Sequence, residues 1–502
     1  MKFKSNKILK NRIFKSDWHK NRPMGIISPS DDYYVQLSNK ILSIIDNSSD
    51  KDIFDEKIKR IIAVNIAAYF EDVISGFGLW RAFVKLYNDM YGKFLPFYEI
   101  YDDEYFEDEI NMFDVLFLLW CFLQRNEIDN EVSRFLNPEN PVLTFLAFEI
   151  FSLLDNEYET APENESINKY IHVIDHSNDF ISARELLYWL HYDCYLSMSY
   201  PKQDLNKQLE MLEDRKTDKF YRENEDLLKY SFEKALIFTS TCSPLALHAK
   251  DWMAQILAGT PKEEGFKSIV FKQIDNYHII DSGAETFTII NAERDKFIVS
   301  LDSLNNPPSM KKENFIMCAL VFFNGLWHVN GFASFASDNR ELVSTNDKSK
   351  LMDNNKKTYD YVLKTTKKPI RYFADAHELK IIMKQLFPET DENKFIPVNF
   401  KNAKNFVLFV HPEIGLSFYP DLALHINDSN NPYYNKEIVE MEGLQVLSGL
   451  YELPKQLIEY LIDNNLLKDI ALNSLHGREY GNKQVQENLR FIVRFFQPDL
   501  YN

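Results

Sequence analysis

The sequence predicts an α+β protein with several domains: an N-terminal helical domain, a central small antiparallel β-barrel and a C-terminal α+β domain. Three observations carry this prediction. Apolar residues recur every three or four positions up to about residue 258, as in amphipathic helices. Between residues 262 and 336 the period changes to two, and after residue 370 helical and alternating segments are mixed. A chain of 502 residues is also long enough for several domains that each bury a core.

The helical domain is expected to span residues 1–258 and to begin with a basic N-terminal arm. One apolar stripe runs from Ile58 to Val73, and a second runs from Trp80 to Tyr91. Each stripe predicts one helix that buries a single face. The segment "ISGFG" between them supplies Gly76 and Gly78, which allow the chain to turn there.

Two further helices of this domain are predicted from their start signals. Asn111 followed by Asp114 is expected to cap the helix that carries "FDVLFLLWCFL". Ser182 followed by Glu185 has the spacing of a reciprocal cap and is expected to begin the helix that carries "RELLYWLHYDCYL".

The barrel is expected between residues 262 and 336 because short alternating runs follow one another closely. These runs are "SIVFKQI", "YHII", "TFTII", "KFIVS" and "FIMCALVFF", and clusters of Asp, Asn, Gly and Ser separate them. Five or six such strands fit most simply into a closed or half-closed barrel.

The segment "LVFFNGLWHVNGF" within this region predicts a β-hairpin. Its Asn-Gly pair tolerates positive φ at both turn positions, so it fixes a two-residue turn. The resulting register pairs Phe323 with Leu326 and Phe322 with Trp327, and Val321 with His328. Trp327 is then expected to be a core residue, whereas His328 projects from the opposite face, either to the surface or into a second core.

Residues 337–369 are expected to form a polar basic linker or an exposed helix, because residues 347–368 carry seven lysines and few large apolar side chains. The C-terminal domain, residues 370–502, is expected to be α+β. Asp375 and Glu378 predict a helix start, "NFVLFVHPEIGLSFYPD" predicts a hairpin, and helices are expected around "GLQVLSGL", "PKQLIEYLIDNNLL" and "VQENLRFIVRFF".

Composition limits the function classes. The formal charge is −18, from 57 basic and 75 acidic residues, and this charge opposes phosphate backbones and anionic lipids. Four widely spaced cysteines favour reduced thiols and a cytoplasmic location. No secretory signal is expected in the basic N-terminal segment, and "VLFLLWCFL" is too short to cross a bilayer, so we expect no membrane contact.

The best metal-like pattern is "IHVIDHSNDF", in which His172 and His176 are four residues apart on an expected helix. Asp175 lies beside them, and His191 follows on the next helix. Two imidazoles at this spacing can face one ion, and a carboxylate can complete its ligands. Because the spacing has low specificity, these four residues are weak metal candidates, and no catalytic or cofactor-binding residue is assigned. The glycine spacings of nucleotide-binding loops are absent from the sequence.

The sequence also resembles a known family. The segments that carry the likeness are "YFEDVISGFGLWRAFVKLYNDMYGKFLPFY", "DEINMFDVLFLLW", "NFVLFVHPEIGLSFYPDLALHI", "NNPYYN" and "RFIVRFF". They resemble an uncharacterised bacterial family of unknown function, found chiefly in gut-dwelling anaerobes, from about Asp17 to Phe496. The resemblance implies no catalytic residue, cofactor or substrate, and it is weakest over residues 347–368.

Together these observations favour a non-enzymatic cytoplasmic protein without a cofactor, which presents surfaces to a protein partner or a small ligand. The net negative charge argues against nucleic acid as a partner. Two alternatives stay open: a metal-dependent hydrolase that uses His172, Asp175, His176 and His191, and a single-stranded nucleic-acid-binding protein that uses the barrel and the basic linker.

Overall fold

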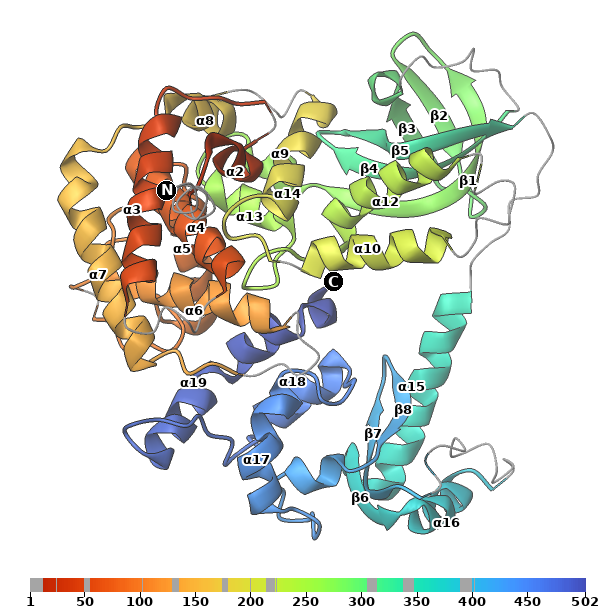
Figure 1. Ribbon diagram of the computed structural model, residues 1–502. Helices are drawn as coiled ribbons and strands as arrows, with labels where there is room; N and C mark the ends of the chain where they lie inside the picture. Colours follow the sequence, from red (N-terminus) through yellow and green to blue (C-terminus); the bar gives the residue numbers. More distant parts are fainter. Residues whose placement is uncertain are drawn as a thin grey trace. The chain divides into compact units, whose positions relative to one another are not determined.

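The computed structural model describes residues 12–23, 25–48, 55–101, 103–128, 135–173, 179–198, 200–213, 222, 224–304, 314–336, 347–388, 400 and 402–502 (Figure 1). The chain forms two compact units. Unit 1 comprises Met1–Val132, Pro138–Val343 and Tyr501–Asn502, and unit 2 comprises Ser133–Asn137 and Ser344–Leu500. The predicted α+β class is confirmed: unit 1 combines helices with a closed barrel, and unit 2 combines helices with a small sheet.

Helices make up the first part of unit 1. Their bounds are α2 (Lys15–Trp18), η1 (His19–Asn21), α3 (Asp31–Asn47), α4 (Glu56–Ser75), α5 (Leu79–Tyr91), α6 (Met112–Ile128), α7 (Pro141–Glu157), η2 (Tyr158–Thr160), α8 (Glu165–Asn168), η3 (Lys169–Val173), α9 (Phe180–Tyr192), α10 (Tyr200–Glu213), α12 (Glu225–Thr239), α13 (Ala249–Ile256) and α14 (Glu263–Lys267).

The turn between α4 and α5 confirms the role predicted for its glycines. Gly76 has φ +62° and ends α4, and Gly78 has φ +86° and precedes α5. Residues with a Cβ rarely adopt this conformation, so glycine is required for the change of direction. In the described part of the chain no single helix is both long and apolar enough to cross a membrane; α4 and α5 pass that test only as a pair, and they are bent by 89°.

One of the two predicted helix starts is correct and one is wrong. The Asn111 side chain accepts the N–H of Phe113 and begins α6, whereas Asp114 is buried in the core instead of capping the helix. At α9 the prediction is wrong, because the helix begins at Phe180 and the Asp179 side chain accepts the N–H of Ile181. Ser182 and Glu185 therefore both lie inside the helix and do not mark its start.

The predicted barrel is a closed sheet of five strands in the order β1-β2-β3-β5-β4. The strands are β1 (Val270–Ser282), β2 (Thr286–Ile290), β3 (Lys296–Ser300), β4 (Phe315–Phe323) and β5 (Leu326–Ala336), and the 3-10 turn η5 (Leu301–Ser303) follows β3. The first two predicted runs are one strand, β1, whose pairing with β4 shifts at a bulge between Lys272 and Asp275. The barrel closes through a parallel pair, Val299 with Trp327, whereas all its other pairings are antiparallel.

The hairpin between β4 and β5 has the predicted register. Phe323 pairs with Leu326, Phe322 with Trp327 and Val321 with His328. Asn324 and Gly325 both have positive φ, at +48° and +86°. Trp327 packs against the barrel core and lies edge-on to Phe297, with 5.2 Å between ring centroids.

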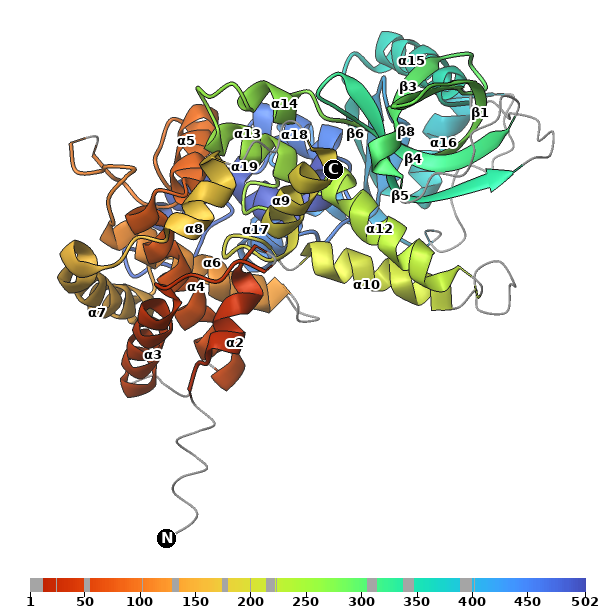
Figure 2. The same ribbon diagram turned by 90° about the horizontal axis from the view of Figure 1, so that it is seen from above.

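Helices cover the other face of this hairpin. The His328 ring stacks on Phe180 of α9, with 4.7 Å between ring centroids, so His328 belongs to a second core between the barrel and the helices. Helix α12 packs along β5 and also contacts α9 and α10 (Figure 2). The helical segment and the barrel, which the sequence treats as separate domains, therefore form one compact unit.

Unit 2 contains a three-stranded antiparallel sheet in the order β6-β7-β8. Its elements are α15 (Asp347–Thr366), β6 (Ile370–Asp375), α16 (Ala376–Leu386), β7 (Lys404–His411), β8 (Gly415–Tyr419), η8 (Leu422–His425), α17 (Lys436–Leu447), α18 (Lys455–Asp463) and α19 (Arg478–Phe496), and η9 (Pro498–Tyr501) follows. The predicted start of α16 is confirmed, because Asp375 accepts the N–H groups of His377 and Glu378.

Much of the segment expected as a linker or an exposed helix belongs to this unit. Helix α15 packs against β7 and β8, and its Val362 is buried with Leu386 and Val410. Tyr359 also packs against this cluster and the Tyr361 ring contacts Phe387, whereas Lys356, Lys357 and Lys364 are exposed.

Candidate functional site

A cleft of about 730 Å³ in unit 1 is the best candidate for a functional site. It is bordered by the α2–η1 segment, the first half of α4, the end of α6, the turn after α9 and the start of α10. We call it the α4 cleft, and its lining residues are Ile13, Asp17, Lys20, Asn21, Glu56, Lys57, Arg60, Ile61, Val64, Asn65, Arg125, Tyr192, Asp193, Cys194, Ser197, Met198 and Lys202.

Helix α4 supplies much of one wall because of its sequence. Glu56, Lys57 and Arg60 lie in its first turns, and Ile61, Val64 and Asn65 continue the lining from three to five residues further along. Residues at this spacing project from neighbouring positions of a helix. The N-cap Asp55 accepts the N–H groups of Lys57 and Ile58 and fixes where this wall begins.

Two asparagines that line the α4 cleft join two of the segments that border it. The Asn21 side chain donates from Nδ2 to Oδ1 of Asn65 at 2.8 Å. The Asn21 carbonyl also accepts the indole N–H of Trp189 at 2.9 Å, so η1 is attached to both α4 and α9. Asn65 is only 5% exposed, and its Nδ2 donates to no partner among the described residues.

Charged side chains also line the cleft around Asn21 and Asn65, which we call the floor of the α4 cleft. Asp17 binds two cations, Arg60 at 2.7 Å and Lys20 at 3.3 Å. Burial raises the pKa of Asp17, but the Phe14 N–H and these two cations lower it by more, so the net shift is downward. On the other side, Lys202 binds Asp193 at 3.1 Å.

Cys194, which lines the α4 cleft, is poorly suited to nucleophilic chemistry. Burial raises the pKa of its thiol to about 12, and the nearby hydroxyl of Ser197 lowers it only in part. Ser197 itself donates to the carbonyl of Leu190 at 2.8 Å. Because the thiolate is the reactive form, a thiol with this pKa is unreactive near neutral pH.

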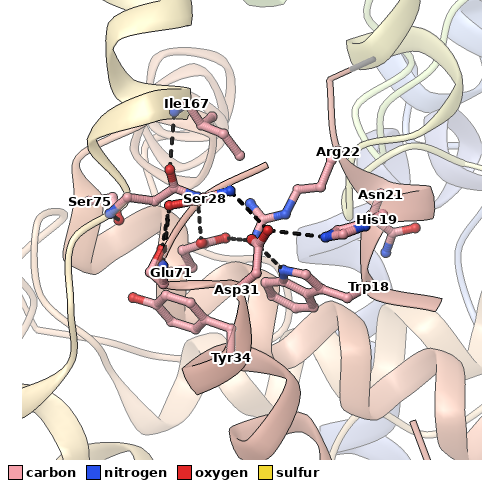
Figure 3. A network of polar contacts seen from close by, with 12 residues as sticks. Trp18, His19, Asn21, Arg22, Ser28, Asp31, Tyr34, Glu71, Ser75 and Ile167 are labelled. Carbon is pink, nitrogen blue, oxygen red and sulfur yellow. Dashed lines mark hydrogen bonds and ion pairs between the residues drawn. The ribbon is translucent and has the colours of Figure 1, made fainter. Parts of the chain in front are cut away.

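The wall formed by α2 and η1 is attached through a buried polar network (Figure 3). Asp31, at the start of α3, accepts the indole N–H of Trp18 at 3.1 Å and the backbone N–H of Ser28 at 2.9 Å. Its second oxygen also lies 3.1 Å from Nε2 of His19. One carboxylate therefore holds two consecutive residues of the α2–η1 segment.

Arg22 extends this network to α4. Its guanidinium forms an ion pair with Glu71, lies 3.7 Å from Asp31 and stacks 4.2 Å from the ring centroid of Trp18 (Figure 3). Glu71 also accepts the side-chain N–H of Asn164 at 2.9 Å. Burial raises the pKa of Glu71 to about 6, although Arg22 and Asn164 favour its charged form. Because both partners are buried, this ion pair is costly to break.

Two more carboxylates, those of Asp72 and Asp114, are buried in unit 1. Asp72 accepts the Tyr195 hydroxyl at 2.7 Å, and Asp114 accepts the hydroxyls of Tyr69 at 2.6 Å and Tyr105 at 2.8 Å. Burial raises the pKa of Asp72 to about 6 and that of Asp114 to about 7, and the tyrosine hydrogen bonds offset this only in part. These groups stabilise the helix packing and do not line the cleft.

The predicted metal cluster is only partly described by the structure. Nε2 of His172 lies 3.0 Å from the Phe77 carbonyl, and Nε2 of His191 lies 3.3 Å from the Ser240 hydroxyl. Asp175 and His176 lie outside the described residues. Within the described residues, no group of three or more His, Cys, Asp or Glu side chains is placed to hold a metal ion. The metal site thus stays a prediction.

Sequence reasoning did not find the α4 cleft, because its residues come from five separate segments. Lys57 and Arg60 gave no clear signal, because cations beside an apolar helix stripe ordinarily lie on a solvated helix face. Asn65 had a clearer signal: it is a polar residue flanked by Val64 and Ile66 within the apolar part of α4.

Comparison with family models identifies the family. The model described as "Protein of unknown function (DUF3843)" matches residues 12–292 and 327–497. The chain belongs to the DUF3843 family. Comparisons with curated proteins and with solved structures give no match. The resemblance stated from the sequence is therefore confirmed for the DUF3843 family, whereas a source in gut-dwelling bacteria stays a prediction.

The DUF3843 match includes every residue that lines the α4 cleft, since they all lie between Ile13 and Lys202. It also includes the network of Trp18, Arg22, Asp31 and Glu71. Residues 293–326, which contain β3 and β4 of the barrel, fall outside the match. Within DUF3843 the cleft therefore lies entirely in matched sequence, and the barrel does so only in part.

Proposed function

We propose that this protein is a non-enzymatic, cytoplasmic binding protein and that the α4 cleft is its site for a small organic molecule. The observation that carries the proposal is the cleft volume of about 730 Å³. Small-molecule sites typically have about 300–1,000 Å³ and combine an apolar lining with a few polar groups. Here Ile13, Ile61, Val64 and Met198 supply the apolar part, and Asn65 supplies a polar group at the floor.

The chemistry of the lining favours binding over catalysis. A hydrolytic or group-transfer site needs a nucleophile or a base that is ready to act. Cys194 carries a thiol whose pKa is raised to about 12, and the carboxylates of Asp17 and Asp193 are engaged by cations. These features support a role in which the ligand is held without chemical change.

The test is a fluorescence titration of the full chain with N-phenyl-1-naphthylamine, a neutral dye that brightens in apolar sites. We expect saturable binding at a single site. Ile61→Trp should weaken it, because the larger side chain narrows the cleft, whereas Ile298→Trp should not, because Ile298 is exposed on the barrel surface. Binding that does not saturate, or that is equal in both variants, would contradict the proposal. Circular dichroism checks that each variant is folded.

We also propose a protein partner as the second candidate function, supported by the net charge of −18. Charge of one sign favours a partner with a basic contact surface and makes the association sensitive to salt. Purification of the tagged full chain from its native host should return one reproducible companion with a basic surface, which 1 M salt (on the order of a 3 Å screening length) releases. A companion that is retained at high salt, or none at all, counts against this candidate.

A further inference from the structure

We propose that the ligand of the α4 cleft is an organic anion, with an apolar body and a carboxylate or phosphate group that Asn65 and Lys57 bind. This inference rests on the proposed function and adds the chemical class of the ligand.

The first support is the free donor at the floor. Asn65 is 5% exposed and lines the cleft, and its oxygen is occupied by the Asn21 side chain. Its Nδ2 donates to no partner in the described part of the chain, so this donor is available to a molecule that enters the cleft. A ligand oxygen would satisfy this donor, and an anionic oxygen would do so with the stronger, charge-assisted bond.

The second support is an excess of cations around the floor. Five basic side chains line the α4 cleft against three acidic ones: Lys20, Lys57, Arg60, Arg125 and Lys202 against Asp17, Glu56 and Asp193. This balance is opposite to that of the whole chain, which carries a net charge of −18. A local reversal of sign attracts ligands of the opposite charge to the cleft.

The third support is that each acidic side chain of the cleft already forms an ion pair with a cation other than Lys57. Asp17 is shared by Arg60 and Lys20, Asp193 binds Lys202, and Glu56 binds Lys59, which does not line the cleft. Within the described residues, the ammonium group of Lys57 forms no ion pair. An anion over the floor would therefore complete the charge balance of Lys57 without displacing an internal pair.

The apolar residues that line the cleft favour a ligand with an apolar body. Ile13, Val64, Cys194 and Met198 are buried yet line the cleft, so a ligand that bound only through its charge would leave this surface in contact with water. A free inorganic anion therefore fits less well than an anion with an apolar body.

The experiment compares two dyes with the same ring systems. 8-Anilinonaphthalene-1-sulfonate carries an anionic group, and N-phenyl-1-naphthylamine lacks it. We expect the anionic dye to bind the full chain at least about tenfold more tightly, and its affinity to fall as salt is added. Equal affinities of the two dyes, with saturable binding in the cleft, would overturn the anion inference and leave the proposed function standing.

Three variants place the anion. Asn65→Asp keeps the side-chain shape and replaces the donor by an acceptor, so it should weaken the anionic dye by at least about tenfold. Lys57→Met should weaken it by about threefold or more, and because Lys57 is exposed this variant is expected to fold. Lys207→Met is the matched control, since Lys207 is exposed on α10 and does not line the cleft.

The neutral dye should bind all three variants as it binds the original chain. An unchanged affinity of Lys57→Met and folded Asn65→Asp for the anionic dye would contradict the assigned contacts.

Competition identifies the anionic group. Octanoate and octyl phosphate present a carboxylate and a phosphate on the same apolar chain, and octanol is their neutral counterpart. Displacement of the anionic dye by octanoate alone assigns a carboxylate, and displacement by octyl phosphate alone assigns a phosphate. Displacement by octanol as effectively as by either anion would overturn the inference.

Discussion

Arg22→Ala should lower the free energy of unfolding by about 3–5 kcal/mol, because it leaves the carboxylate of Glu71 buried without its cation. The side chain of Glu71 has no exposed surface and that of Arg22 has very little, so water cannot replace the lost partner. The measurement is urea unfolding at pH 8, above the pKa of about 6 of Glu71, so that the carboxylate is charged.

Two comparisons identify the cause of that loss. The double variant Arg22→Met with Glu71→Gln removes both charges and should be more stable than Arg22→Ala, because no unpaired charge is then buried. Lys40→Ala breaks an exposed pair with Glu157 and should cost no more than about 1 kcal/mol. If the free energy of unfolding of Arg22→Ala lies within about 1 kcal/mol of that of the original chain, the variant does not leave Glu71 as an unpaired buried charge.

The same change should affect the α4 cleft. Arg22 directly follows η1, and η1 carries Asn21, which joins the cleft floor through Asn65. If the ion pair with Glu71 holds this wall, folded Arg22→Ala protein should bind the neutral dye more weakly than the original chain, whereas Lys40→Ala should bind it equally well.

Asp114→Asn should change how stability depends on pH. Burial raises the pKa of Asp114 from 3.8 to about 7, so this carboxyl binds a proton more readily in the folded than in the unfolded protein. The stabilisation that comes from this tighter proton binding by Asp114 is therefore fully present below about pH 4. It is lost as the pH rises through about 7. The amide has a similar shape and does not titrate, so the variant should gain on the original chain as the pH rises.

The quantity to measure is the difference in the free energy of unfolding between the original chain and Asp114→Asn at pH 5, 6, 7 and 8. We expect this difference to shift by roughly 2–4 kcal/mol in favour of the variant, since one pKa unit corresponds to about 1.4 kcal/mol. The difference is used because buried histidines such as His191, whose pKa burial lowers to about 3, act in the opposite direction and are common to both proteins. Asp103→Asn, an exposed carboxylate, is the control. A difference that stays constant across this range would show that Asp114 does not titrate as described.

Short-range sequence patterns predicted much of the secondary structure. The Asn324-Gly325 turn fixed the register of β4 and β5, and the glycines after α4 fixed the turn to α5, because in each case the backbone conformation depends on the residues at the turn itself. Asp375 predicted the start of α16 for the same reason, since its side chain binds backbone groups two and three residues away. At α9, two possible caps lay three residues apart, and the spacing of Ser182 and Glu185 favoured the wrong one.

Longer-range features could not be predicted in this way. The parallel contact that closes the barrel joins Val299 to Trp327, and the stacking that gives His328 a role joins it to Phe180 of a distant helix. Asp114 has the spacing of a helix cap, yet the hydroxyls of Tyr69 and Tyr105 make it a buried acceptor. The periodicity of one segment does not reveal which other segment covers it.

The sequence by itself determined the α+β class, the helical and strand-forming regions, the hairpin register and the membership of a family of unknown function. Only the tertiary structure brought Asn21, Asn65, Arg125, Cys194 and Lys202 into one cleft. The physical reason is that a turn or a cap is built from neighbours along the chain, whereas a cleft is built from the packing of helices whose order in the sequence does not state which faces meet.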